Sequence, residues 1–197
     1  MVRRYIGPTK IQVPIVTIPD FYNPNFIQKR RLKRIIDDNY EQYFPWQGKS
    51  SNMNVPMISE PTIFSELYNK FLDISREMFG KFTLSDRNLS TCWVYRGNKI
   101  DRGNRTEKWW HNHSTSSTIN AVYYLQVFND GVSFIGLDGQ VQDYLPKNNE
   151  LIIFPADLVH SPQPCTLQKY RYSVNMEILT EETSSDLFSR VFKYGFS

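Results

Sequence analysis

Apolar positions along the chain change their spacing near residue 85. Before that point they recur every three or four residues, which predicts amphipathic helices over about 24–42 and 62–80. A short apolar run over 12–18 predicts a strand ahead of the first helix. The segment 44–61, which is rich in proline, separates the two helices and is expected to be a loop.

Beyond residue 85, runs of β-branched and aromatic residues alternate with turn residues such as Asn, Asp and Gly. Short strands at this spacing are typical of an antiparallel sandwich or barrel, which the two helices would buttress. The segment 186–196 fits either a strand or a helix. Five strands are predicted, over 89–96, 118–128, 132–137, 150–154 and 170–179.

The expected fold is therefore mainly β with N-terminal helices, in a single domain over residues 1–197. Within it, 1–84 would be a helical N-terminal support, 85–180 the β core and 181–197 a tail element. Hydrophobic residues make up 40% of the chain, which argues against disorder throughout. No apolar run reaches the roughly 18–20 residues of a membrane span, and the N-terminus shows no signal-like apolar segment.

Cysteine content and charge narrow the range of compartments and partners. Cys92 and Cys165 do not make a disulfide framework, so a reducing, cytoplasmic location is expected. A net charge of +3 is too small to indicate a nucleic-acid partner. The basic run over 29–34 is expected to be a solvated helix face.

The chain has only three histidines, and all of them lie in its second half. His111 and His113 are two residues apart just before a predicted strand, so extended backbone would point both imidazoles to the same side. A hairpin topology would bring His160 opposite them. Because imidazole is the commonest side-chain metal ligand, the three histidines indicate a metal site. On its own, a His-x-His pair also occurs at surfaces or as a hydrogen-bonded core pair.

Arg171 and Ser173 follow His160 on the last predicted strand. Their spacing of two residues places both side chains on one face. A guanidinium fork and a hydroxyl together make a receptor for a carboxylate. A metal on one side and this anchor on the other would fit a small dicarboxylate, with one end on each.

Four segments, in this order and at this spacing, resemble the 2-oxoglutarate- and iron(II)-dependent oxygenases. The likeness is to the small prolyl-hydroxylase-like branch with its phage and bacterial relatives, and it covers about 85–180. It implies a double-stranded β-helix, or jelly roll, with the metal at the mouth of the barrel. The segments are Trp110–His113, Asn120–Leu125, Leu151–Ser161 and Arg171–Ser173.

The resemblance also implies roles for single residues. His111 matches the first iron ligand and His160 the distal one. The other matches belong to the pocket of the cosubstrate 2-oxoglutarate: Arg171 pairs with its far carboxylate, Ser173 helps with a hydroxyl, Tyr124 hydrogen-bonds the same carboxylate, and Tyr95 lines the pocket.

The chain departs from the family pattern at one ligand. The usual motif is His-x-Asp or His-x-Glu, whereas His113 stands at the carboxylate position here. His113 would bind iron as a third imidazole, or stand aside and leave water there, or mark a site that is inactive or prefers another metal. We expect it to be a ligand, because extended backbone already directs it inward.

The expected function is an iron(II)- and 2-oxoglutarate-dependent oxygenase that uses O2 to hydroxylate a C–H bond. A prolyl or other amino-acid residue of a peptide or protein, or a small molecule, is the favoured substrate class. The segment 98–108 would be a substrate lid. Two alternatives stay open: a cupin-type metal enzyme that does not use 2-oxoglutarate, and a non-catalytic jelly-roll module for binding or structure.

Overall fold

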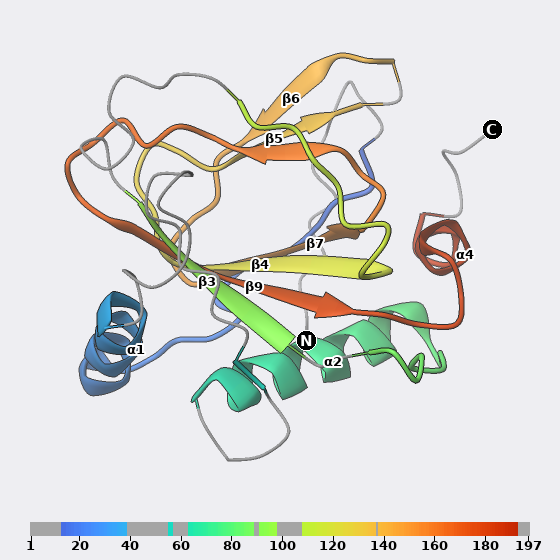
Figure 1. The fold of residues 1–197 in the computed structure, drawn as a ribbon, viewed down its shortest axis with the longest axis horizontal. Helices are drawn as coiled ribbons and strands as arrows, with labels where there is room; N and C mark the ends of the chain where they lie inside the picture. The colour runs from blue at the N-terminus through green and yellow to red at the C-terminus, as the bar shows by residue number, and fades with distance from the viewer. Residues whose placement is uncertain are drawn as a thin grey trace.

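The computed structural model describes residues 13–38, 55–56, 63–88, 91–97, 108–136 and 138–192, with only the backbone at 55, 56 and 91. Over these ranges the chain is mainly β, with two antiparallel sheets and a few helices (Figure 1). In chain order the elements are β1 (Val16–Ile18), α1 (Phe26–Asp38), β2 (Val55–Pro56), α2 (Ile63–Phe79), β3 (Thr91–Gly97), β4 (Ile119–Gln126), β5 (Val132–Ile135), β6 (Val141–Tyr144), β7 (Glu150–Pro155), β8 (His160–Pro162), β9 (Arg171–Ile178) and α4 (Ser184–Ser189).

The two sheets lie in separate layers. The larger sheet has six strands in the order β1-β7-β4-β9-β3-β2, and the smaller has three in the order β6-β5-β8. In Figure 1 the smaller sheet lies over one face of the larger sheet, whereas α1 and α2 lie against the opposite face. The larger sheet therefore has one face toward the helices and one toward the space between the sheets.

The face toward the helices is apolar. Val174, Met176 and Ile178 of β9 are buried in the same cluster as Phe64 and Phe71 of α2. Their spacing follows the alternation of a strand, in which every second side chain points to the same face. Burying a side chain of this size contributes about 1.5–3 kcal/mol, so the many buried side chains of this layer contribute substantially to the fold's stability.

The predicted helices are confirmed as α1 and α2, and local chemistry explains two of their ends. Asn25 and Gln28 form a reciprocal capping box before α1, with each side-chain oxygen accepting from the other residue's backbone N–H at 2.9 Å. Gly80 follows α2 with φ of +74°, a left-handed conformation that favours glycine. Residues 39–42 and 62 of the predicted ranges lie outside the described residues.

All five predicted strands of the β core are present with shifted ends, as β3, β4, β5, β7 and β9. The first predicted strand, 12–18, is found as the shorter β1. The hydrophobic pattern missed β6, β8 and the two-residue β2, which lies inside the segment 44–61 that was expected to be a loop and pairs with β3; the rest of that segment lies outside the described residues. Strand β6 is too exposed to alternate between apolar and polar residues, and β8 is three residues long and ends on a proline that the pattern marks as a turn.

Of the segment 186–196, which fitted either a strand or a helix, residues 186–189 belong to the helix α4, and residues 193–196 lie outside the described residues. Thr183 caps α4 with a capping box to Asp186, and Phe188 packs on Phe79 with ring centroids 4.8 Å apart. The predicted lid over 98–108 lies outside the described residues except for Lys108. None of the helices in the described ranges has the length and apolar character needed to cross a membrane.

Candidate metal centre

Two short backbone segments bring the three histidines together. His111 and His160 form an isolated antiparallel bridge, in which His111 N donates to His160 O at 3.0 Å and His160 N donates to His111 O at 2.9 Å. Beside this bridge, His113 N donates to Ala156 O at 2.8 Å. The expected approach of His160 to the other two is therefore found, between the segment before β4 and the start of β8.

The three imidazole rings face one another. The ring centroids of His111 and His160 are 4.4 Å apart, and that of His113 lies 5.1 Å from the first and 5.2 Å from the second. One ring nitrogen of each histidine lies within 4.8 Å of the corresponding nitrogens of the other two. Small ring rotations would bring all three onto one ion, because metal–nitrogen bonds are about 2.1 Å long.

His111 and His160 each use Nδ1 for a hydrogen bond that settles their tautomer. Both acceptors are backbone carbonyl oxygens, so each of these Nδ1 atoms carries the hydrogen and each Nε2 of the neutral ring keeps its lone pair. A lone pair on Nε2 is what a metal ion requires. The acceptors are Trp109 O for His111 at 3.0 Å and Leu158 O for His160 at 2.8 Å, whereas Glu177 Oε1 lies 2.7 Å from His113 Nδ1 as an ion-pair contact.

Burial keeps two of the three rings uncharged. Burial first, and then the neighbouring His111 and His113, lower the pKa of His160 to about 3. Burial is also the main cause that lowers the pKa of His111. Near neutral pH these two rings are therefore neutral, with their lone pairs available for a metal.

Aromatic side chains form the walls around the rings. Phe154 lies edge-on to His160 with ring centroids 4.8 Å apart, and Phe134 lies 6.2 Å from the same ring. Trp93 lies 5.6 Å from His113, and Trp109 lies 5.4 Å from His111. The phenylalanines are buried, whereas Trp109 is 54% exposed, so Trp109 marks the side on which the rings approach solvent.

The donor set fits a transition metal. Three imidazoles in one group suit iron, zinc, copper and nickel, and such ions keep further positions open for other ligands. His113 lies within this group rather than apart from it. Of the three outcomes expected for His113, the arrangement thus favours a third imidazole ligand.

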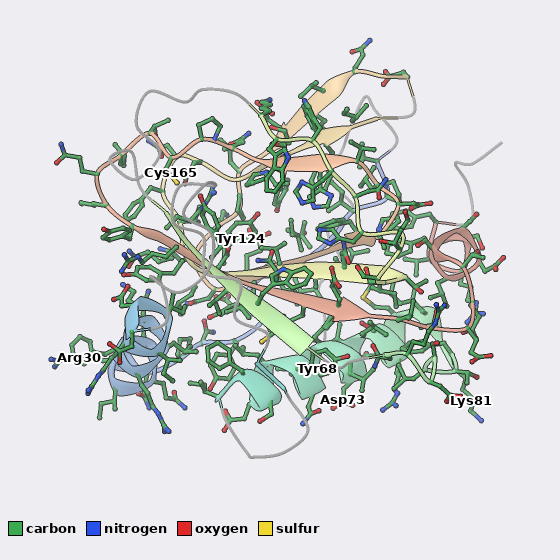
Figure 2. All side chains as sticks on the ribbon, viewed as in Figure 1. Arg30, Tyr68, Asp73, Lys81, Tyr124 and Cys165 are labelled. Atoms are coloured by element: carbon green, nitrogen blue, oxygen red, sulfur yellow. The ribbon has the colours of Figure 1, made fainter. Side chains whose placement is uncertain are left out.

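A second group of predicted residues lies across three neighbouring strands. Ser173 of β9 pairs with Tyr95 of β3 on one side and with Tyr124 of β4 on the other. Directly paired residues project from the same face of a sheet, so all three share one face. Tyr124 packs with Val132 of β5, and Figure 2 shows it on the side of β4 toward the smaller sheet. This face is therefore the one that looks into the space between the sheets.

Arg171 lies on the same face, two residues before Ser173, and is 2% exposed. Its guanidinium carbon lies 4.9 Å from the centre of the Tyr95 ring. Burial raises the pKa of Tyr124, so that hydroxyl stays protonated and can donate. The structure therefore brings Tyr95, Tyr124, Arg171 and Ser173 into one region, as the sequence predicts.

Arg171 also has partners that sequence reasoning missed. Its Nη1 donates to Asp130 Oδ2 at 3.3 Å, Gly131 O at 3.2 Å and Gln163 O at 3.1 Å. The ion pair is buried on both sides, since Asp130 is 4% exposed. In the sequence, Asp130 belongs to an Asn-Asp-Gly run that indicates only a turn, so no signal pointed to this role.

Glu177, whose Oε1 lies 2.7 Å from His113 Nδ1, was missed as well. A signal for it existed, because Arg171, Ser173, Asn175 and Glu177 are spaced by two along one strand and must share a face. What the sequence could not show is that this face carries Glu177 to the histidines.

Comparisons with known proteins give matches in structure but not in sequence. No protein-family model matches the chain, and no curated protein matches it. A prolyl-4-hydroxylase from Pseudomonas putida is similar with a TM-score of 0.59 and 14% identity, over 87% of this chain and 95% of the other.

Two further solved structures are similar to a comparable degree. HygX from Streptomyces hygroscopicus, solved with nickel and 2-oxoglutarate bound, has a TM-score of 0.61 and 10% identity over 87% of this chain and 85% of its own. SnoN, a non-heme α-ketoglutarate-dependent epimerase from nogalamycin biosynthesis, has a TM-score of 0.64 and 11% identity, over 85% of this chain and 78% of its own. The resemblance to the 2-oxoglutarate- and iron(II)-dependent oxygenases that the sequence motifs indicate is therefore confirmed at the level of the fold.

Proposed function

We propose that this protein is an iron(II)- and 2-oxoglutarate-dependent oxygenase that hydroxylates a C–H bond, built as one domain around a double-stranded β-helix. The observation that carries the proposal is the pair of groups on the inner side of the larger sheet. Three imidazoles converge in one group, and a buried arginine with two tyrosines and a serine forms the other. A reducing, cytoplasmic location is part of this proposal and rests on the cysteine content.

In this reaction 2-oxoglutarate, O2 and R–H give succinate, CO2 and R–OH. His111, His113 and His160 would hold iron(II) through Nε2. Iron(II) supplies the redox chemistry that couples O2 to oxidation of the cosubstrate and the substrate. The phenylalanine walls around His160 exclude water from the reacting centre.

The cosubstrate would be oriented by the second group. The Arg171 guanidinium would pair with the far carboxylate, while the hydroxyls of Tyr124 and Ser173 donate to the same group. The Tyr95 ring, which already lies against the guanidinium, would form one wall of the pocket. Held at both ends, 2-oxoglutarate would be fixed relative to the metal before O2 arrives.

The substrate would approach from the side of Trp109, where the histidines come nearest to solvent. A peptide residue or a small molecule suits this proposal, and a nucleic acid does not, because the net charge of the chain is low. Proteins of this fold include hydroxylases and an epimerase, so the reaction type must be tested directly.

One observation favours a second candidate, the cupin-type metal enzyme without 2-oxoglutarate. Arg171 already has a buried carboxylate partner in Asp130 and two carbonyl partners. Those contacts give the arginine a structural role that requires no cosubstrate. The non-catalytic module is the third candidate, and metal analysis of the purified protein separates it from both enzymes.

The test measures turnover and cosubstrate binding together. Wild-type protein reconstituted with iron(II) is expected to bind 2-oxoglutarate and to convert it to succinate and CO2. Ser173→Ala should weaken 2-oxoglutarate binding by about 10-fold, close to the lower end of the effect of one hydrogen bond to a charged group. Arg171→Ala should weaken it by at least about 100-fold.

The matched control is Arg87→Ala, which removes an exposed guanidinium. Binding of metal without any binding of 2-oxoglutarate would favour the cupin-type enzyme. A protein with no affinity for iron(II) would favour the non-catalytic module.

A further inference from the structure

The starting point is a carboxylate next to the third histidine. Glu177 Oε1 lies 2.7 Å from His113 Nδ1, and their side chains are 11% and 18% exposed. Glu177 Oε2 accepts from Ser116 Oγ at 3.3 Å. Within the described residues, no lysine or arginine forms an ion pair with Glu177, and the ion pair that it does form is with His113.

Glu177 is also held firmly by the fold. It pairs with Asn120 in the register of β9 with β4, which places it in the interior of the larger sheet. Its carbonyl oxygen accepts from Tyr68 Oη at 3.1 Å, a contact that ties the strand to α2. A carboxylate on so rigid a support can fix the ring plane of the histidine it contacts.

A largely buried carboxylate is costly unless positive charge lies close to it. A metal ion on Nε2 of the His113 ring changes this, because it makes the Nδ1–H a stronger donor and places positive charge behind it. The contact is therefore understandable as part of a metal site.

We propose that Glu177 replaces, at a distance, the carboxylate that usually binds the metal directly in such a site. Glu177 orients His113 through Nδ1, and it supplies its negative charge through the His113 ring instead of by direct contact with the metal. This proposal rests on the proposed function only in requiring that the three histidines bind a metal. Glu177 is a positioning residue, since it acts through His113 and touches neither metal nor substrate.

The first experiment measures metal affinity and needs no turnover. Metal-free protein is titrated with cobalt(II), and binding is followed through the ligand-field absorption of the ion. Glu177→Gln keeps an acceptor oxygen but removes the charge, and we expect about 10-fold weaker binding. Glu177→Ala removes both, and we expect about 100-fold weaker binding, the range found for partners of metal-bound histidine.

Glu181→Gln is the matched control, because it removes an exposed carboxylate four residues away. It is expected to leave the affinity and the spectrum unchanged. Thermal unfolding of each metal-free variant shows whether the loss of affinity comes with a loss of folding.

The second experiment moves the carboxylate inward. In a His113→Asp background the ligand itself carries the charge, so Glu177 has nothing left to supply. Adding Glu177→Gln in that background should change cobalt(II) affinity by less than about 3-fold. A merely structural role for Glu177 would give the same loss in both backgrounds.

The outcomes separate the two proposals. Wild-type protein that binds no cobalt(II) or iron(II) overturns the metal site and with it the proposed function. Wild-type protein that binds metal, with Glu177→Gln and Glu177→Ala equally tight, overturns the role of Glu177 and leaves the proposed function standing. Equal losses in the wild-type and His113→Asp backgrounds overturn the role of Glu177 too.

Discussion

The two faces of the larger sheet carry different chemistry, and β9 shows both. Val174, Met176 and Ile178 point to the helices and are buried among apolar side chains. Ser173 and Glu177 alternate with them and therefore project from the opposite face of the strand, toward the space between the sheets. Stability and chemistry are therefore divided between alternate residues of one strand, so a substitution can affect one while sparing the other.

The largest effect is expected on the inner face, at the metal group. His160→Ala removes one of three converging ligands and should abolish measurable binding of cobalt(II) or iron(II). The fold should remain, because the helix-facing layer is untouched. Metal content after dialysis tests the loss of binding, and circular dichroism tests whether the fold remains. Metal binding with native affinity in this variant would exclude His160 as a ligand.

The converse substitution lies on the helix-facing side. Phe71 is fully buried in α2, so Phe71→Ala should lower the free energy of unfolding by about 3–5 kcal/mol through lost contacts and a cavity. Urea unfolding measures this loss. Metal affinity of the protein that remains folded should stay unchanged, and a parallel loss of affinity would show that the two faces are coupled.

A smaller effect is expected from the buried ion pair on the inner face. Asp130→Asn leaves the Arg171 guanidinium without its compensating charge and should lower the free energy of unfolding by about 3 kcal/mol. Asp157→Asn is the control, because Asp157 is exposed and should change stability by less than about 0.5 kcal/mol. Equal stabilities of the two variants would mean that Arg171 does not depend on Asp130.

The smallest effect is a pH dependence of the metal-free protein. Burial lowers the pKa of His160 to about 3, whereas an unfolded histidine has a pKa near 6.5. Between these values the unfolded chain binds more protons, so stability falls as the pH falls. From pH 7 to pH 5 the loss should be about 2 kcal/mol.

His160→Gln should flatten this pH dependence, since it removes the titrating ring. Urea unfolding in the presence of a chelator at several pH values measures both proteins. A wild-type stability that stays constant from pH 7 to pH 5 would contradict the effect of burial on His160.

Much of the fold was predictable because local patterns report it. The spacing of apolar residues predicted α1 and α2, and β-branched runs predicted the longer strands. Strands β6 and β8 escaped because their pairing with β5, rather than any local pattern, makes them strands. The same holds for α4. The sequence pattern of its segment fitted a helix and a strand equally, and capping by Thr183 together with packing of Phe188 favours the helix.

The candidate site divides in the same way. By itself, the sequence determined which residue types are available and which of them share a strand face, and this named the three histidines, Arg171 and Ser173. Only the tertiary structure decided which carboxylates accompany them, because Asp130 and Glu177 reach Arg171 and His113 from 41 and 64 residues away. The physical reason is that alternation along a strand is local, whereas pairing of buried charges requires strands and loops to be brought together by folding.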